Sequence, residues 1–218
     1  MQSPLLHLLI LAGIAIFLIL RLRNVLGTRE GFEKPRVAEP VQRGPRPDFE
    51  VIEGGPDHDI TDYVEAGSKA AEALAAMKRV EPSFSVTQFV QGARGAYEMI
   101  VTGFDKGELA QIQPFLAEDV FDTFVDVVAQ REDKGLTIES EFIGVREIAI
   151  ADADFARDTG RAEITMRFVG ELTSVIRDRD GTVIEGSPTA SKRQKDVWTF
   201  ARTMGTDDPN WILVATDA

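Results

Sequence analysis

The apolar positions of the chain follow three patterns in succession. Residues 4–20 are uncharged and almost wholly apolar. Residues 27–59 show no apolar periodicity and are rich in proline and glycine. From Ile60 apolar residues recur at three- and four-residue spacing, and from Leu136 they alternate with polar ones. The first period is typical of helices and the second of strands, so the pattern predicts an apolar segment, a linker and a folded domain.

The N-terminal apolar run is long enough to cross a membrane. As a helix, residues 4–20 span about 26 Å, close to the thickness of a bilayer's hydrocarbon core. We therefore predict a transmembrane anchor with a basic flank over 4–26. The alternative is a cleavable signal peptide, which needs a basic start and a small-residue cleavage site, and the sequence shows neither. The anchor residues are Leu5, Leu11, Ile16, Leu20, Arg21 and Arg23.

Basic side chains predict the orientation of this anchor. Arg21 and Arg23 directly follow the apolar run, whereas residues 1–3 carry no charged side chain. Basic flanks of a membrane span stay on the cytoplasmic side. We expect a single-pass protein with its N-terminus outside and its C-terminal domain in the cytoplasm.

Residues 27–59 are predicted to be a flexible tether. A segment of this composition cannot bury a core of its own. Asp57, His58 and Asp59 at its end could be read as a metal site. A short polar cluster in a linker is more often solvated chain, which is the interpretation we favour.

Residues 60–218 are predicted to form one α+β domain that begins with helices. The expected helices cover 60–80, 85–104 and 116–131, with a short one over 106–111. Ser85 and Gln88 match a capping box at the start of the second main helix. Pro82 and Gly135 act as stop signals after the first and third.

The alternating pattern predicts four strands after the helices. The expected strands cover 137–150, 161–177, 192–203 and 211–216, with a bend at Gly144 and a hairpin turn over 178–181. Runs of helices followed by runs of strands indicate an α+β fold. A long, twisted antiparallel sheet wrapped by about three helices makes a cone with a pocket, as in the nuclear-transport-factor-2-like (NTF2-like) arrangement.

Aromatic residues are the candidates for lining such a pocket. They are Tyr97, Phe104, Phe124, Trp198, Phe200 and Trp211. Trp198 and Phe200 share one face of a predicted strand, and the turn over 208–210 delivers Trp211 into the last one. The same positions also suit plain core packing between sheet and helices, and the pattern favours core packing over a ligand pocket.

Charge and composition exclude several classes of function. The net charge is −12, while residues 1–36 carry +3, so the remainder is strongly acidic. Nucleic-acid binding relies on lysine and arginine, so we expect no nucleic-acid partner. There are no cysteines, and both histidines, His7 and His58, precede the predicted domain. Cysteine-based chemistry is excluded, and we expect neither a metal site nor a cofactor.

Particular segments of the chain resemble a known family. They are the apolar span running into 21–27, the helical region 107–131, the segment 142–146, and above all Asp196–Arg202 and Asp208–Leu213, a pair of tryptophan-containing strands around a short loop. With these the sequence resembles the alphaproteobacterial Tim-forty-four-like (TimA) family, relatives of the motor-anchoring subunit of the mitochondrial inner-membrane presequence translocase. The resemblance implies an inner-membrane location and a role in tethering partners there.

We therefore expect a membrane-anchored, non-enzymatic scaffold at the cytoplasmic face of the inner membrane. Its expected partners are the lipid bilayer, through the anchor, and a protein: a translocating chain, a chaperone or a membrane-protein assembly factor. A homodimer through the open sheet face is a further expectation from the fold.

The alternative is a pocket protein that binds a small molecule or a lipid, or an enzyme that uses Asp and Tyr groups. The candidate groups are Asp122, Asp126, Glu139, Glu141, Tyr63 and Tyr97. The chain has none of the common nucleophile, phosphate-loop, dinucleotide or metalloprotease motifs, so we expect no enzyme activity. A buried carboxylate beside a tyrosine in a roomy pocket would favour the enzyme.

Overall fold

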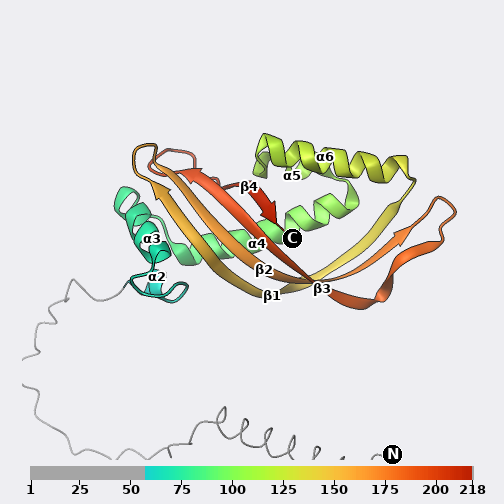
Figure 1. Ribbon diagram of the computed structural model, residues 1–218, viewed down its shortest axis with the longest axis horizontal. Helices are drawn as coiled ribbons and strands as arrows, with labels where there is room; N and C mark the ends of the chain where they lie inside the picture. Colours follow the sequence, from blue (N-terminus) through green and yellow to red (C-terminus); the bar gives the residue numbers. More distant parts are fainter. Residues whose placement is uncertain (1–56, 218) are drawn as a thin grey trace, which may run out of the picture. The chain divides into compact units, whose positions relative to one another are not determined.

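The computed structural model describes residues 57–217 (Figure 1). The predicted anchor over 4–26 and nearly all of the predicted tether lie outside these residues. The helical elements are α2 (His58–Thr61), α3 (Lys69–Val80), α4 (Val86–Lys106), α5 (Leu109–Ile112), the 3-10 helix η1 (Gln113–Phe115) and α6 (Glu118–Asp133). The strands are β1 (Thr137–Ala156), β2 (Arg161–Arg177), β3 (Val183–Thr203) and β4 (Ile212–Asp217). The predicted order of helices followed by strands is confirmed.

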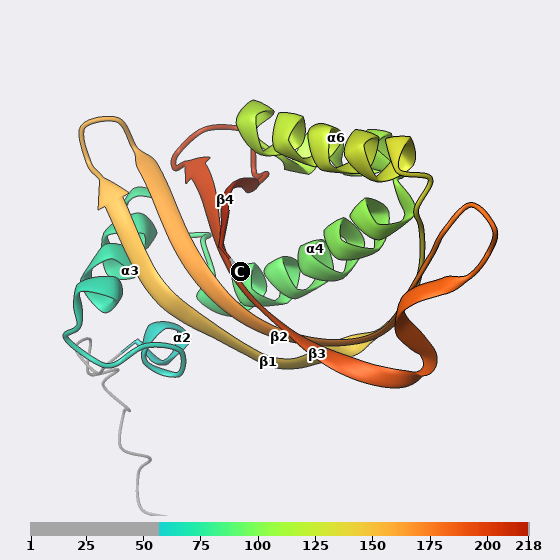
Figure 2. The same ribbon diagram turned by 45° about the vertical axis from the view of Figure 1, so that its right-hand side comes forward.

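The strands form one antiparallel sheet in the order β1-β2-β3-β4, the predicted meander. The long strands curve, and α4 and α6 lie on the concave side of the curve (Figures 1 and 2). Register shifts in β1, including one between Phe142 and Gly144, mark bulges that increase bending and twist. The bend predicted at Gly144 is therefore present, and two further bulges extend it along the strand.

Strand β2 runs through the centre of the sheet with the predicted bounds. Its inward side chains Ile164, Met166 and Phe168 are fully buried, as the alternation predicts. Strand β3 differs, because it begins at Val183 rather than at the predicted Lys192. Its first nine residues include Gly186 and Pro188. Pro188 lies in a register shift against β2, where its missing N–H costs no hydrogen bond between the strands.

The helix predicted over 60–80 is wrong as a single element. The structure has two helices, α2 and α3, with a break at Gly67, whose φ is +76°. Only glycine adopts this left-handed conformation at no steric cost. Ser68 then starts α3, because its hydroxyl accepts a hydrogen bond from the N–H of Ala71 at 3.2 Å.

The interpretation of residues 57–59 as solvated chain is wrong for Asp59, which is held by hydrogen bonds to α4, whereas Asp57 and His58 are exposed. Asp57 caps α2 by accepting from the N–H of Asp59 at 3.0 Å. The folded part therefore includes residues that the sequence assigned to the tether, and Ile60, the first predicted domain residue, is already buried inside it.

Asp59 joins the start of the domain to the start of α4. Its carboxylate accepts from the N–H groups of Val86 at 2.8 Å and Thr87 at 2.9 Å, and from Ser85 Oγ and Lys78 Nζ at 3.0 Å each. The first N–H groups of a helix have no acceptor within the helix. Here the carboxylate of Asp59, a residue outside α4, accepts the hydrogen bonds of two of these groups. Burial raises the pKa of Asp59, but the hydrogen bonds from Thr87, Lys78 and Val86 outweigh it and hold the pKa well below its ordinary value.

Asp59→Ala is expected to lower the free energy of unfolding by about 1–3 kcal/mol, because it leaves two partly buried N–H groups and Lys78 without their acceptor. The depressed pKa makes this stabilisation present above pH 3.8, the ordinary value, and lost as the pH falls below it. Urea unfolding followed by tryptophan fluorescence between pH 3 and 7 measures both effects. Asp62→Ala, whose carboxylate is 70% exposed, is the matched control and should change little. Equal effects of the two substitutions would contradict this role of Asp59.

Candidate functional site

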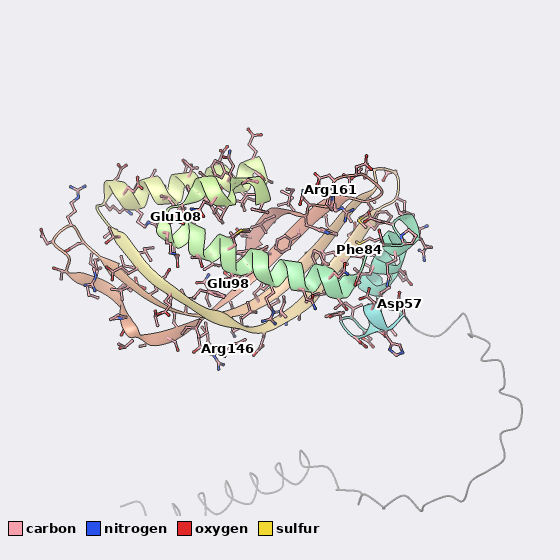
Figure 3. The ribbon with its side chains drawn as sticks, turned by 180° about the vertical axis from the view of Figure 1, so that it is seen from behind. Asp57, Phe84, Glu98, Glu108, Arg146 and Arg161 are labelled. Atoms are coloured by element: carbon pink, nitrogen blue, oxygen red, sulfur yellow. The ribbon has the colours of Figure 1, made fainter. Side chains whose placement is uncertain are left out.

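A groove of about 500 Å³ opens beside the first half of α4. Figure 3 shows Phe84, one of its wall residues, at the same end of the domain as Asp57. The apolar lining comes from α4, the loop before it, η1, β3 and the loop between β3 and β4. These residues are Phe84, Phe89, Gly92, Ala93, Ala96, Met99, Phe115, Phe200, Pro209 and Trp211. The polar lining consists of Glu81, Ser83, Ser85, Gln88, Arg202 and Asn210.

Aromatic rings in mutual contact form one wall of the groove. The rings of Phe89 and Trp211 lie 4.6 Å apart between centroids, and those of Phe84 and Trp211 5.9 Å. Phe89 meets Phe200 edge-on at 6.1 Å. Phe84, Phe89 and Phe200 are buried, whereas Trp211 is half-buried. Rings held at these spacings form a preformed apolar surface.

Small residues of α4 provide the space. Ala93 and Ala96 project little, and Gly92 has no side chain at all. A Cβ placed at Gly92 would meet no atom within 4 Å. Gly92 is exposed and lines the groove, so we expect a larger side chain at this position to take up groove space rather than to disturb the core.

The polar end of the groove is an ion pair whose charges are already satisfied. Arg202 donates to both carboxylate oxygens of Glu81, at 2.8 and 2.6 Å, and to the carbonyl of Asp208 at 3.1 Å. The N–H of Gly205 also donates to Glu81. The hydrogen bond from Arg202 is the main cause that lowers the pKa of Glu81. The Arg202 side chain is 8% exposed, so it offers no free cation to an anionic ligand.

The aromatic residues singled out in the sequence separate into three places. Phe200 and Trp211 line the groove, while Tyr97 and Trp198 are buried in the core. Phe104 and Phe124 pack on each other at 4.6 Å between α4 and α6, where the Arg131 guanidinium lies 5.9 Å from the Phe104 ring centroid. The anchor residues lie outside the described part of the chain.

Sequence reasoning missed Phe84, Phe89 and Phe115 as lining residues. A usable signal was present for the first two. Phe84 precedes the N-cap Ser85 and Phe89 is the fourth residue of the helix, the spacing of a hydrophobic staple. The rings of Phe84 and Phe89 both contact Trp211, so the two residues of the hydrophobic staple also form part of the groove wall.

Tyr97 and Asp196 form a buried carboxylate–tyrosine pair. The Tyr97 hydroxyl donates to Asp196 Oδ2, and Gln194 Nε2 donates to the other carboxylate oxygen at 3.2 Å. The Tyr97 ring is fully buried and stacks on Phe168 at 4.4 Å. Burial, and then Asp196, raise the pKa of Tyr97 far above its ordinary value. Neither residue of the pair lines the groove, so the groove does not lead to this carboxylate and hydroxyl.

The other candidate groups for Asp and Tyr chemistry are also away from the groove. Asp122, Asp126, Glu139 and Glu141 are exposed, on α6 and on β1. Tyr63 donates to Thr87 Oγ1 at 3.2 Å. The structure does not bring these groups together.

Tyr97→Phe is expected to lower the free energy of unfolding by about 1–3 kcal/mol, because it leaves the buried carboxylate of Asp196 without its main donor. Since the pKa of Tyr97 is raised, its contribution is present below pH 10.0, the ordinary value, and declines as the pH rises above it. The variant should therefore lose less stability than the natural chain between pH 9 and 11. Tyr63→Phe is the matched control for loss of a tyrosine hydroxyl. Identical alkaline profiles for Tyr97→Phe and the natural chain would contradict the assignment.

The fold and the groove define the class of the described part: an α+β domain in which helices cover one face of a four-stranded meander and leave a largely apolar groove open at one end. The chain belongs to the Tim44-like domain family, whose model matches residues 70–218. It is similar to mitochondrial import inner membrane translocase subunit TIM44 of Homo sapiens, with 23% identity over 154 residues. The match covers 69% of this chain and 34% of that relative, so the chain spans about a third of its length.

Among solved structures, the crystal structure of the intermembrane space region of the chloroplast protein ARC6 is 12% identical to this chain. It covers 57% of this chain and 94% of its own, with a TM-score of 0.36, a likeness too low to establish a common fold. None of the helices between residues 57 and 217 has the length and apolarity that a membrane crossing requires.

Proposed function

We propose that the chain is a membrane-anchored, non-enzymatic scaffold of protein translocation, whose Tim44-like domain binds an apolar segment of a protein partner. The observation that carries this proposal is the groove beside α4. Its volume of about 500 Å³ lies within the ~300–1,000 Å³ of typical ligand sites. Family membership and the similarity to the human translocase subunit support the connection with translocation.

The chemistry of the groove favours an uncharged apolar occupant. Its long wall is aromatic, and the Glu81–Arg202 pair at its end is neutral and saturated by hydrogen bonds. A ligand charge would lose water there without gaining a partner, which is costly. Apolar side chains of an extended or unfolded segment fit these conditions.

The proposed anchor over 4–26 would compensate for the weak affinity expected of such a small site. A groove that holds only a few side chains binds weakly, and tethering raises the effective concentration of the domain at the membrane without any new contact. The uncharged run 4–20 and the basic Arg21 and Arg23 support a single-pass anchor with the domain on the cytoplasmic side of the inner membrane.

Gly92→Leu tests the groove directly. The new side chain has room and extends into the groove, so it should weaken binding of a defined Leu- and Phe-rich peptide by about tenfold or more, as one excluded apolar side chain removes ~1.5–3 kcal/mol. Titration of the full chain in lipid nanodiscs, read by tryptophan fluorescence, gives the affinity.

Gly95→Leu is the matched control for that variant. Gly95 lies on the same helix, and a Cβ placed there would also meet no atom within 4 Å, but Gly95 does not line the groove. Both substitutions replace an exposed helical glycine and should raise helix stability alike. Equal peptide affinities of the two variants would refute the groove as the binding site.

Deletion of residues 1–26 tests the tether. Loss of the anchor should reduce, by about 100-fold or more, the yield of proteins photo-crosslinked from Gln88 in the groove, because effective concentration is lost. Replacing residues 4–20 by a leucine run of equal length is the control and should restore the yield. Unchanged crosslinking and full growth after the deletion would overturn the tethering role.

A further inference from the structure

The sheet has a free edge where β3 extends past the end of β4. Strand β4 pairs with β3 only from Val197 to Ala201, and the partner of Val197 is Asp217. Residues 191–196 of β3 pair with β2 on one side, and no element between 57 and 217 forms backbone hydrogen bonds with them on the other. Figure 2 shows this part of β3 along the rim of the sheet, beyond β4. Every second residue of such an edge directs its N–H and C=O outward, where another strand can pair with them.

Residues 191–196 lack the backbone features that usually block an edge. The residues just before them have such features, because Pro188 has no N–H to donate and a register shift against β2 separates Ser187 from Ser191. Residues 191–196 contain neither proline nor glycine, and they keep an unbroken register with β2. This part of β3 is therefore a regular template for one further strand, in line with β4.

The side chains of this edge are basic, although the chain as a whole is acidic. Lys192, Arg193 and Lys195 are exposed, while the net charge of the chain is −12. None of the three forms an ion pair with another residue in the described part of the chain. Their charges are therefore available to a partner.

The carboxylate opposite Arg193 is already engaged. Glu171 of β2 pairs with Arg193 across the strands, and it accepts from Ser191 Oγ at 2.6 Å and from the guanidinium of Arg146. Figure 3 shows Arg146 on the side of the sheet away from α4. Because two other donors hold Glu171, it does not saturate the charge of Arg193.

The basic side chains point to one face of the edge. Asp196 points toward the helices, where it accepts from Tyr97 of α4. Successive side chains of a strand alternate between the faces, so Arg193 and Lys195 point to the opposite, convex face. An added strand would place two of its own side chains opposite them, two positions apart. Opposite charges that face each other across strands attract, so the matching strand carries Asp or Glu at alternate positions.

We propose that residues 191–196 are a strand-addition site for an extended acidic segment of a protein partner. Main-chain hydrogen bonds to β3 hold this segment, and its alternate carboxylates pair with Arg193 and Lys195. The site goes beyond the proposed function, because none of its residues lines the groove. The domain then has two separate binding surfaces, one apolar and one basic.

Charge argues against a second copy of this chain as the occupant. Two copies that paired their β3 edges in antiparallel fashion would be related by a two-fold axis normal to the sheet. Such an axis keeps both convex faces on the same side, so Arg193 and Lys195 of the two copies would lie together and repel each other. An acidic segment meets the same residues with attraction.

Peptide titration tests the charge pattern in the full chain. The probe is a short fluorescent peptide in which glutamate alternates with valine and threonine, titrated against the chain in nanodiscs of uncharged lipid. R193E/K195E should weaken its binding by about tenfold or more, because two attractive cross-strand pairs become repulsive. The same variant should bind the corresponding lysine peptide more tightly than the natural chain does.

R79E/R157E is the matched control for that variant. It makes the same change of net charge at two exposed residues, one on α3 and one in the turn between β1 and β2. It should change the affinity for either peptide by about twofold at most, since interactions between exposed charges beyond ~10 Å are screened by salt. Equal losses in the two variants would mean that net charge alone attracts the peptide, which would overturn the proposal.

Backbone methylation separates strand addition from simple charge attraction. Methyl groups on all glutamate nitrogens block one edge of the peptide, and methyl groups on the nitrogens between them block the other. One of these two peptides should bind as the unmodified peptide does, and the other about tenfold more weakly or worse. Hydrogen exchange of residues 191–196 should slow with the first and not with the second. Equal binding of both methylated peptides, or no binding of the unmodified one, would overturn the proposal.

The oligomeric state tests the remaining role for the basic residues. Lysine and arginine at an edge also prevent pairing between copies. If R193T/K195T associates into dimers or larger species in sedimentation, while the natural chain does not bind the glutamate peptide, the charges only guard the edge and the proposal is overturned. The expected result is unchanged sedimentation with about tenfold weaker binding of the glutamate peptide. Binding of the Leu- and Phe-rich peptide to the groove should stay unchanged in this variant.

Discussion

Helix α4 packs into the concave side of the sheet through Tyr97, and the rest of the domain depends on this contact. The Tyr97 ring stacks on Phe168 at 4.4 Å with 8° between the planes, and it contacts Trp198 at 4.8 Å. Gly170 makes the close approach possible, because a Cβ at that position would lie 2.7 Å from the tyrosine oxygen. The hydroxyl reaches Asp196, so one side chain links α4, β2 and β3 by stacking and by a buried hydrogen bond. Buried polar groups without partners are costly, so the pair also fixes the rotation of the helix.

With α4 fixed at Tyr97, the groove follows from what the helix carries before it. Gly92, Ala93 and Ala96 are too small to fill the distance to β3 and to the loop before β4. The neighbouring side chains Phe89 and Trp211 close one wall and leave the remaining space open. The same helix is thus a core element around Tyr97 and lines an open groove one to two turns earlier. The carboxylate–tyrosine pair lies on the packed part of the helix, apart from the residues that line the groove.

Much of this fold follows from the sequence, and the exceptions have physical causes. The bounds of β2 and the cap at Ser85 are readable because alternation and capping are local signals. The break between α2 and α3 is hidden, because helical spacing continues across Gly67. The first part of β3 is also hidden, since Gly186 and Pro188 interrupt its alternation while pairing with β2 keeps it in the sheet.

The groove was harder to predict than the fold, for a related reason. Sequence pattern gives the face on which a residue lies but not how far the opposing layer covers that face. Tyr97 and Phe200 both point between helices and sheet, yet the first is sealed in the core and the second lines open space. Phe84 and Trp211 come together from distant parts of the chain, a contact that no local period reports.

Asp59 holds the start of α4 in place beside the groove. Four hydrogen bonds from Lys78, Ser85, Val86 and Thr87 converge on this one carboxylate. Charge-assisted hydrogen bonds of this kind are stronger than neutral ones. Ser85 also lines the groove, so the contacts that satisfy the first turn of α4 also fix one side of the groove. The position of this side is therefore set by a carboxylate that lies 26 residues earlier in the chain.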